Sequence, residues 1–255
     1  MLEYQEQVLM DCREERSSIV TGQMNLFGGE SEAVRETPIP SLPELERSAL
    51  LQLEHESLGL YLSGHPLEQS QWLRQLCRAT PAAALSEQPD GGKVLLIVTL
   101  QHVKQHTTKK GETMCFLTCE DQSGSADCVV FPALYNSVKP YLQQDAVLYL
   151  RGKISQKENA VSVLCDSVLQ EEAFFRTLPQ GRLCVKIDSR QTAELQQLLA
   201  VIGQHAGNVP VCFYLTDRKK MLSPRGGQAV AVNSESYAAL CAVVSPEQVG
   251  FLPPA

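Results

Sequence analysis

The sequence lacks several features that would place it in a familiar class. It has no run of about 18 apolar residues, so we expect no membrane-spanning helix. Its first residues are acidic and lack the apolar stretch of a signal peptide, so we expect a cytoplasmic protein. It contains no glycine-rich phosphate loop, and the spacing of its residues suggests no Ser/His/Asp or Cys/His site. These absences favour a binding or assembly role, with no cofactor in this chain.

Metal sites are also hard to build from this sequence. The nine cysteines include no CxxC pair, and the nearest two are Cys115 and Cys119. If they lie on one strand, they are roughly 13 Å apart and cannot share an ion. Two-metal catalysis needs paired aspartates, whereas Asp121, Asp127, Asp145 and Asp166 are scattered. We therefore expect the cysteines to be small buried apolar groups in a reducing compartment.

The net charge of −7 is unevenly distributed. Residues 1–75 contain 5 arginines, no lysine and 13 acidic residues, a net charge of −8, which leaves about +1 for residues 76–255. An acidic surface does not suit phosphate binding. Any contact with nucleic acid is therefore expected in the later part of the chain.

The first 44 residues fall into two segments. Residues 1–20 have a weak helical pattern typical of the end of an upstream domain that is truncated here. Residues 21–44 are rich in glycine, glutamate and proline, as in a flexible linker. Within it stands a short apolar peptide, Gln23-Met24-Asn25-Leu26-Phe27. It has too few apolar neighbours to form a core, so we expect it to bind a pocket on another protein, with docking onto this chain as the alternative.

A helical segment is predicted over residues 45–80. Its apolar residues fall mostly on one side of a helix over residues 44–62, and they are Leu45, Ala49, Leu50, Leu53, Leu58 and Leu60. The turn Ser63-Gly64-His65-Pro66-Leu67 follows, and then a short helix through Trp72 and Leu76. His65 has no visible partner cluster and is expected to stabilise the turn.

The pattern then changes to that of a barrel over residues 90–170. We expect strands at 93–103, 114–120, 125–131, 146–154 and 160–169, and a helix at 132–142 between the third and fourth. This order is that of a five-stranded OB-fold β-barrel. With a small α/β domain predicted over residues 180–255, the fold class is α+β with several domains.

OB-folds bind oligonucleotides or oligosaccharides on the face of strands 2 and 3 and on two connecting loops. The first loop is expected to carry Lys104, His106, Lys109 and Lys110, and the region of strands 4 and 5 adds Arg151, Lys153 and Lys157. Aromatic residues that could stack on bases are Phe116, Phe131 and Tyr149, although some of them must be core. We predict nucleic-acid binding by Lys104, His106, Lys109, Lys110, Phe116, Arg151 and Lys153, against the alternative that the charges are ordinary solvated surface.

The last predicted domain alternates strand and helix. We expect strands at 182–187, 209–215, 229–232 and 249–252, and helices at 193–202 and 234–244, the second capped by Ser234. Arg218, Lys219 and Lys220 are expected in a polar connection. This part contains no visible catalytic constellation.

Three stretches resemble one known family. Gly59–Leu67, Phe116–Gly124 and Val130–Tyr135 are similar to the C-terminal part of the alpha subunit of bacterial replicative DNA polymerase III, a C-family polymerase. The intact family member is a DNA-directed DNA polymerase with additional upstream domains. The motifs for its catalytic aspartates are not in this sequence, so we expect this chain to be inactive alone, and magnesium would belong to the absent catalytic domain.

The resemblance also implies binding partners. The family carries a clamp-binding pentapeptide before its OB domain, and Gln23–Phe27 matches it in place and pattern, with Asn25 departing from the commoner Ser or Asp. It implies contact of the OB domain with single-stranded template, and binding of the clamp-loader tau subunit by residues 180–255. The expected role is therefore DNA replication, as a fragment or split-gene product of the polymerase. The alternatives are a free-standing OB-fold accessory protein and an enzyme with an unrecognised site, such as an anticodon-binding extension of a synthetase.

Overall fold

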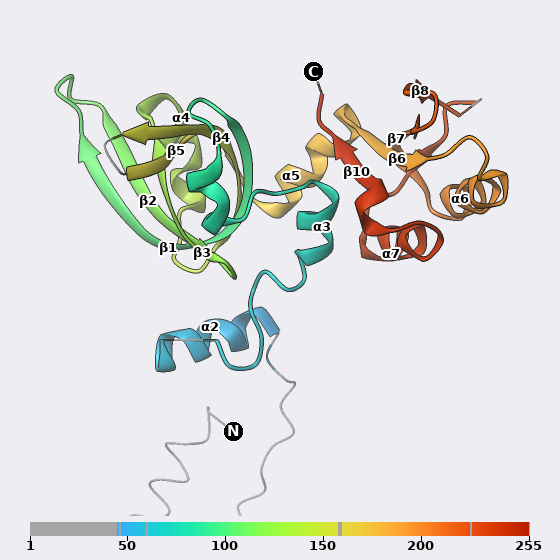
Figure 1. Ribbon diagram of the computed structural model, residues 1–255. Helices are drawn as coiled ribbons and strands as arrows, with labels where there is room; N and C mark the ends of the chain where they lie inside the picture. Colours follow the sequence, from blue (N-terminus) through green and yellow to red (C-terminus); the bar gives the residue numbers. More distant parts are fainter. Residues whose placement is uncertain (1–44, 46, 60, 158–159, 225, 255) are drawn as a thin grey trace, which may run out of the picture. The chain divides into compact units, whose positions relative to one another are not determined.

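The computed structural model describes residue 45 and residues 47–59, 61–157, 160–224 and 226–254 (Figure 1). The helix predicted over residues 1–20, the linker over 21–44 and the peptide Gln23–Phe27 lie outside the described residues. From residue 47 onward the chain forms one unit, Arg47–Ala255. Among the described residues, no helix is both long and apolar enough to cross a membrane.

This unit contains a closed five-stranded barrel (Figure 1). Its strands follow one another around the barrel in the order β1-β2-β3-β5-β4, with β1 pairing both β2 and β4. The helix α4 (Pro132–Val138) lies between β3 and β4 in the chain, so the predicted OB-fold is confirmed. The strand bounds are β1 Lys93–Thr107, β2 Thr113–Asp121, β3 Gly124–Val130, β4 Val147–Lys157 and β5 Ala160–Leu169.

Alternation along the strands builds the barrel core. On β2 the side chains of Cys115, Leu117 and Cys119 are buried, while Phe116 between them is exposed. β3 and β5 run parallel and close the barrel, with Cys128 beside Val163. Cysteine serves here as a small apolar residue, as predicted: six of the eight described cysteines are buried and all eight are free thiols. Burial raises the pKa of the Cys115 thiol to about 11, which keeps this thiol protonated and unreactive at neutral pH.

Two elements of the barrel end four residues from their predicted ends, and β4 ends three residues later than predicted. β1 continues four residues beyond the predicted end, because it pairs with β2 as far as Thr107 and Thr113. Lys104 and His106 therefore lie on a strand, not in the first loop. The helix predicted over 132–142 stops at Val138 and continues as a short 3-10 turn, Lys139–Tyr141. Pro140 explains the change, because proline cannot donate the backbone hydrogen bond that an α-helix needs.

The helical segment before the barrel contains α2 (Arg47–Leu58), α3 (Gln71–Leu76) and the 3-10 helix η2 (Ala82–Glu87). The predicted buried face of α2 is wrong: Leu51 is buried, whereas Leu50, Leu53 and Leu58 are 39–54% exposed. Gly59 directly follows the last residue of α2, and its φ of +72° suits glycine at the end of a helix. The turn at His65 is confirmed, since its Nδ1 accepts a hydrogen bond from the backbone N–H of Leu67 at 3.1 Å.

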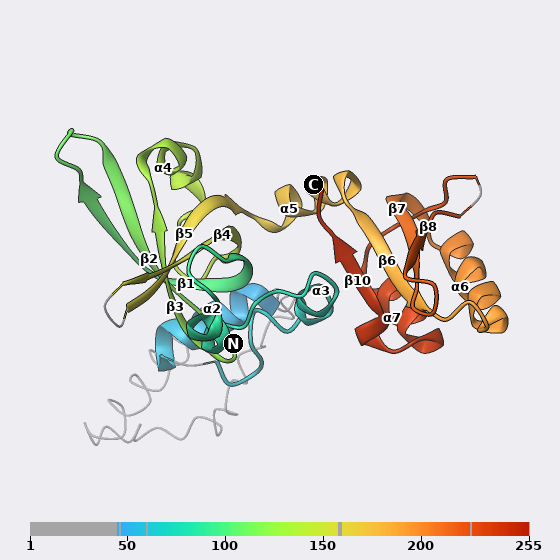
Figure 2. The same cartoon turned by 45° about the horizontal axis from the view of Figure 1, so that its top comes forward.

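After the barrel, the short helix α5 (Glu171–Thr177) leads into a mixed sheet of order β10-β6-β7-β8, with β9 also pairing β7 (Figure 2). β6 and β7 are parallel and joined by α6, a βαβ crossover. The strand β8 lies where a polar connection was predicted. The bounds are β6 Arg182–Ile187, α6 Thr192–Gln204, β7 Ala206–Leu215, β8 Lys220–Leu222, β9 Ala229–Val230, α7 Ser234–Val243 and β10 Val249–Leu252.

The cap of α7 differs from the prediction by one residue. Asn233, not Ser234, is the N-cap, and its Oδ1 accepts a hydrogen bond from the backbone N–H of Ser236 at 2.8 Å. In return, the Ser236 hydroxyl accepts from the Asn233 N–H at 3.1 Å. The side chain at position 233 reaches a backbone N–H group of the first turn. This explains why Asn233, and not the neighbouring Ser234, is the N-cap.

Candidate nucleic-acid interface

The outward face of β1 and β2 brings together three of the predicted residues. Lys104 is paired directly with Phe116, and Phe116 with Val129 on β3, so these side chains form one row across three strands. His106 lies two residues beyond Lys104, and its ring meets the edge of Phe116 with centroids 6.2 Å apart. Phe116 is 42% exposed, which leaves ring surface available for a base.

The turn between β1 and β2 presents Lys109 and Lys110. Backbone hydrogen bonds close it: Thr108 N–H donates to the Glu112 carbonyl at 2.8 Å, and Gly111 N–H to the Thr108 carbonyl at 2.9 Å. Gly111 has a φ of +80°, a conformation that suits glycine. Both lysines are exposed. The turn therefore holds two positive charges at the tip of the β1–β2 hairpin, beyond the row that contains Phe116.

The β4–β5 hairpin bounds the same face on its other side. Lys153 on β4 pairs with Leu164 on β5, and Leu164 pairs in turn with Val129 on β3. Lys153 is exposed, as is Lys157 further along the strand. Figure 1 shows both hairpins extending on the same side of the barrel. The face thus has lysines at both edges and apolar side chains between them, the arrangement expected of a surface that binds a single strand.

Arg151 and Tyr149 lie apart from this face. Tyr149 is fully buried and stacks on Phe174 of α5 with ring centroids 4.6 Å apart, so its prediction as a base-stacking residue is wrong. Burial raises the pKa of its hydroxyl to about 12, and the hydroxyl lies 3.3 Å from Ser70 Oγ. Arg151 points toward α5, with its guanidinium carbon 5.4 Å from the Phe174 ring centroid.

The sequence interpretation missed two residues on the outer surface of the barrel. His102 is exposed on β1, two residues before Lys104 and on the same face, beside Thr118 of β2. Lys93 is exposed at the start of β1 and pairs with Lys153. The alternation of a strand extended through Thr107 would have indicated His102, since residues two apart share a face.

Comparison with known proteins agrees with this geometry. Residues 94–170 match a protein family described as an OB-fold nucleic acid binding domain. Over 204 residues, 78% of this chain, 29% of residues are identical to the DNA polymerase III subunit alpha of Bacillus subtilis, and over 211 residues, 81% of this chain, 29% are identical to that of Thermus aquaticus. The chain is related in sequence to DNA polymerase III subunit alpha. It spans only 18% and 17% of these two relatives, respectively.

Solved structures add little to the relation with DNA polymerase III alpha. A domain of replication protein A from Methanococcus maripaludis matches 33% of this chain and 88% of its own length, with 10% identity. Its TM-score of 0.29 is too low to support an argument.

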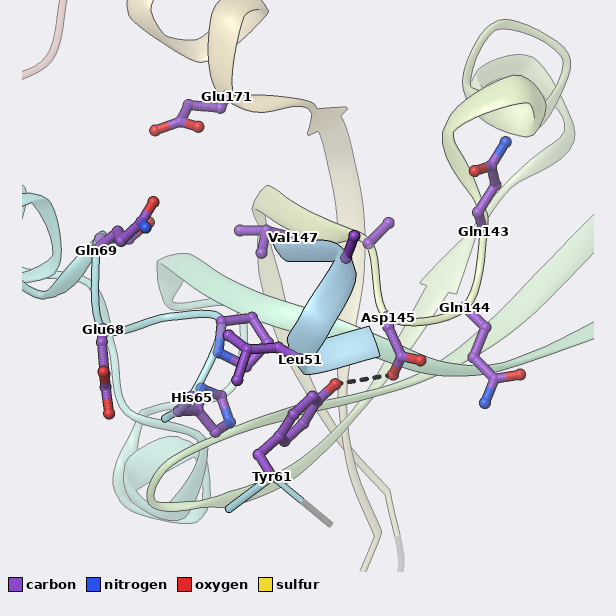
Figure 3. A pocket seen from close by; sticks show the side chains of 14 residues that line it. Leu51, Tyr61, His65, Glu68, Gln69, Gln143, Gln144, Asp145, Val147 and Glu171 are labelled. Carbon is purple, nitrogen blue, oxygen red and sulfur yellow. Dashed lines mark hydrogen bonds between the residues drawn. The ribbon is translucent and has the colours of Figure 1, made fainter. Parts of the chain in front are cut away.

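The turn that carries much of the resemblance to the alpha subunit lines a pocket of about 440 Å³ (Figure 3). Tyr61 donates a hydrogen bond to Asp145 Oδ1 at 3.0 Å, and His55 Nδ1 lies 3.1 Å from the same carboxylate. Burial, followed by this hydrogen bond, raises the pKa of Tyr61 well above its usual range. The other polar lining is acidic or neutral and includes Glu68, Gln69, Gln143, Gln144 and Glu171. Such a lining does not suit a phosphate backbone, so this pocket is not part of the interface.

Proposed function

We propose that this chain acts in bacterial chromosome replication as the C-terminal segment of a DNA polymerase III alpha subunit. In this role it binds single-stranded template across the face of β1, β2 and β3. The observation that carries the proposal is the row of Lys104, Phe116 and Val129, with Lys109 and Lys110 at one edge and Lys153 at the other. The lysines would hold phosphates and Phe116 would stack on a base, which is how proteins bind single strands with little sequence preference.

Charge reversal in the β1–β2 turn tests this interface. Lys109→Glu with Lys110→Glu is expected to weaken binding of labelled oligo-dT at least tenfold at about 0.15 M salt, because two phosphate contacts are lost and two repulsive charges are added. The slope of log affinity against log salt should also become shallower by about 1.4. Fluorescence anisotropy across a salt series measures both.

A matched control is available at another pair of adjacent lysines, the last residue of the β7–β8 turn and the first residue of β8. Lys219→Glu with Lys220→Glu makes the same charge change at two exposed positions near β8. This variant should bind oligo-dT with nearly wild-type affinity. Equal weakening by both pairs would mean that net charge, and not the turn, governs binding.

We also propose that Gln23-Met24-Asn25-Leu26-Phe27 binds the sliding clamp. Leu26 and Phe27 would enter an apolar pocket on the clamp while Gln23 forms hydrogen bonds at its edge. Support comes from the resemblance of the peptide to the clamp-binding motif of the family and from the relation of this chain to the alpha subunit. Binding to the clamp and binding to the template would together keep a polymerase on its DNA.

We also propose that the sheet within residues 180–255 binds the tau subunit of the clamp loader. α6 and α7 share a core with one face of this sheet through Val185, Phe213, Leu198 and Leu240. On the opposite face, Met221 is paired with Tyr214 and is 47% exposed. An exposed apolar side chain beside a half-buried tyrosine is typical of a protein interface.

Polar substitution on this sheet face tests the tau assignment. Tyr214→Ser with Met221→Ser is expected to weaken capture of tau about tenfold or more, because the contact would lose its largest apolar groups. Surface plasmon resonance with immobilised tau measures the change. Tyr141→Ser, at a tyrosine that is 40% exposed on the barrel side, is the control and should leave tau binding intact. Undiminished capture by the double variant would remove this face from consideration.

A free-standing OB-fold accessory protein remains the alternative, because residues 94–170 by themselves match a nucleic acid binding domain. The DNA upstream of the Met1 codon distinguishes the two. A continuous reading frame encoding polymerase domains supports the alpha-subunit segment, whereas a stop codon and ribosome-binding site there support the accessory protein.

A further inference from the structure

Arg151 lines a second cleft, on the side of the barrel toward β10. The cleft has a volume of about 450 Å³. It is formed by the start of β1, the middle of β4, the later part of β5, residues that follow α3, Phe174 of α5, and Phe251 with the two prolines after β10. Its charged lining residues are Arg78, Lys93, Arg151 and Asp166. Three positive charges and one negative charge therefore meet in one cleft.

The three cations of the cleft are Arg78, Lys93 and Arg151. None of them takes part in an ion pair among the described residues. Arg78 donates one hydrogen bond, to the Glu247 carbonyl at 3.2 Å, and Arg151 lies over the Phe174 ring. Both guanidinium groups are thus oriented by neutral groups, and Asp166 is the one acidic residue in the lining of the cleft. Like charges brought together in this way favour an anion between them.

The cleft is continuous with the proposed template-binding face. Lys93 pairs across the strands with Lys153, which is the lysine at the β4–β5 edge of that face. Arg151 lies two residues before Lys153 on the same strand, about 6.6 Å away. The positive charges of Lys153 and Lys93 therefore lie next to those of the cleft.

We propose that this cleft binds the phosphate backbone of the same single strand where the strand leaves the barrel face. The inference rests on the proposed function. Guanidinium groups suit this task, because their planar donors match phosphate oxygens in pairs. The cleft offers no ring for stacking, since Phe174 is fully buried and Phe251 is 8% exposed. The contact is therefore with the backbone alone and independent of base sequence.

The test removes two of the cations. Arg78→Ala with Lys93→Ala should weaken binding of an oligo-dT of about 20 nucleotides roughly tenfold at about 0.15 M salt and make its salt slope shallower by about 1.4, as expected for two lost phosphate contacts. Binding of an oligo-dT of about 6 nucleotides, which fits on the barrel face alone, should change less than twofold. Arg151 is left in place because it packs on Phe174. The matched control, Arg218→Ala with Lys219→Ala, removes the same two residue types from the exposed β7–β8 turn.

The outcomes separate the two proposals. If the variant binds the long oligonucleotide as the wild type does, while the Lys109 and Lys110 variant binds it weakly, the cleft assignment fails and the barrel face stands. Equal weakening for short and long oligonucleotides would also overturn the cleft, because it would show a general loss of binding. If the wild-type chain binds neither oligonucleotide, the proposed function itself fails.

Discussion

Asp121→Asn is expected to lower the free energy of unfolding by about 3 kcal/mol, the low end of the range for breaking a buried ion pair. The Asp121 side chain is 1% exposed and forms an ion pair with Arg74. Its two oxygens also accept backbone hydrogen bonds from Ser123 at 2.8 Å and from Ala82 at 3.1 Å. One carboxylate thus joins the β2–β3 turn to α3 and η2. An asparagine amide keeps the size but loses the charge and one acceptor.

The pH dependence gives a second readout at the same residue. Burial by itself would raise the pKa of Asp121, but the hydrogen bonds from Ser123 and Ala82 and the charge of Arg74 together lower it. A lowered pKa in the folded state means that its stabilisation is complete above the unfolded pKa of about 3.9 and is lost as the pH falls through the folded value. Lowering the pH from about 6 to about 3 should therefore reduce the free energy of unfolding of the wild type more than that of the variant. Urea titrations at each pH measure this free energy.

Asp127→Asn is the control for this measurement. Asp127 lies on β3 of the same hairpin but is exposed. Its substitution should change the unfolding free energy by less than about 0.5 kcal/mol. If both variants shift the urea midpoint equally, the network around Asp121 does not support the barrel as its geometry indicates.

The contrast between the barrel and α2 shows what the sequence can predict. Strands of the barrel alternate between core and solvent, so Cys115, Leu117 and Cys119 reveal the buried side without any knowledge of the neighbours. α2 has leucines on several sides, and only one of them, Leu51, is buried. Which side is buried depends on contacts distant in sequence, such as that of His55 on α2 with Asp145, at 3.1 Å. Periodicity contains no information of that kind.

In the candidate interface, too, the sequence predicts the position of some residues and not of others. Lys109 and Lys110 could be placed because a polar turn between two strands must present its side chains to solvent. Lys104 and His106 were placed in the loop because the end of β1 has few apolar residues to mark it as a strand. The position of Arg151 depends on Phe174, which belongs to a helix beyond the barrel. Long side chains are directed by such tertiary partners, and so the second cleft could not be predicted.

The barrel face and the cleft would contribute different contacts to the binding of a single strand. On these proposals the barrel face would contribute stacking and phosphate contacts, and the cleft would add phosphate contacts that extend the path of the strand. The phosphate contacts of both surfaces would weaken as the salt concentration rises, because they depend on a few screened charges. A separate attachment that does not depend on salt would complement them, and an apolar peptide can provide it.

Leu26→Ala with Phe27→Ala is therefore expected to abolish retention of the chain on an immobilised bacterial sliding clamp. Burying both side chains contributes roughly 3–6 kcal/mol before the cost of ordering the peptide. Since 1.4 kcal/mol corresponds to tenfold, the loss should be at least 100-fold in affinity. The effect should persist at about 0.5 M salt, where oligo-dT binding is weak, because apolar contacts are not screened.

Two controls make this result specific. Glu30→Ala with Glu32→Ala changes the same stretch of sequence without touching the peptide and should leave retention on the clamp unchanged. The Leu26 and Phe27 variant should also bind oligo-dT as the wild type does, because its barrel is untouched. Retention of this variant on the clamp at the wild-type level would show that Gln23–Phe27 is not the clamp-binding peptide. If retention and oligo-dT binding fell together, the peptide would instead contribute to the fold of the chain itself.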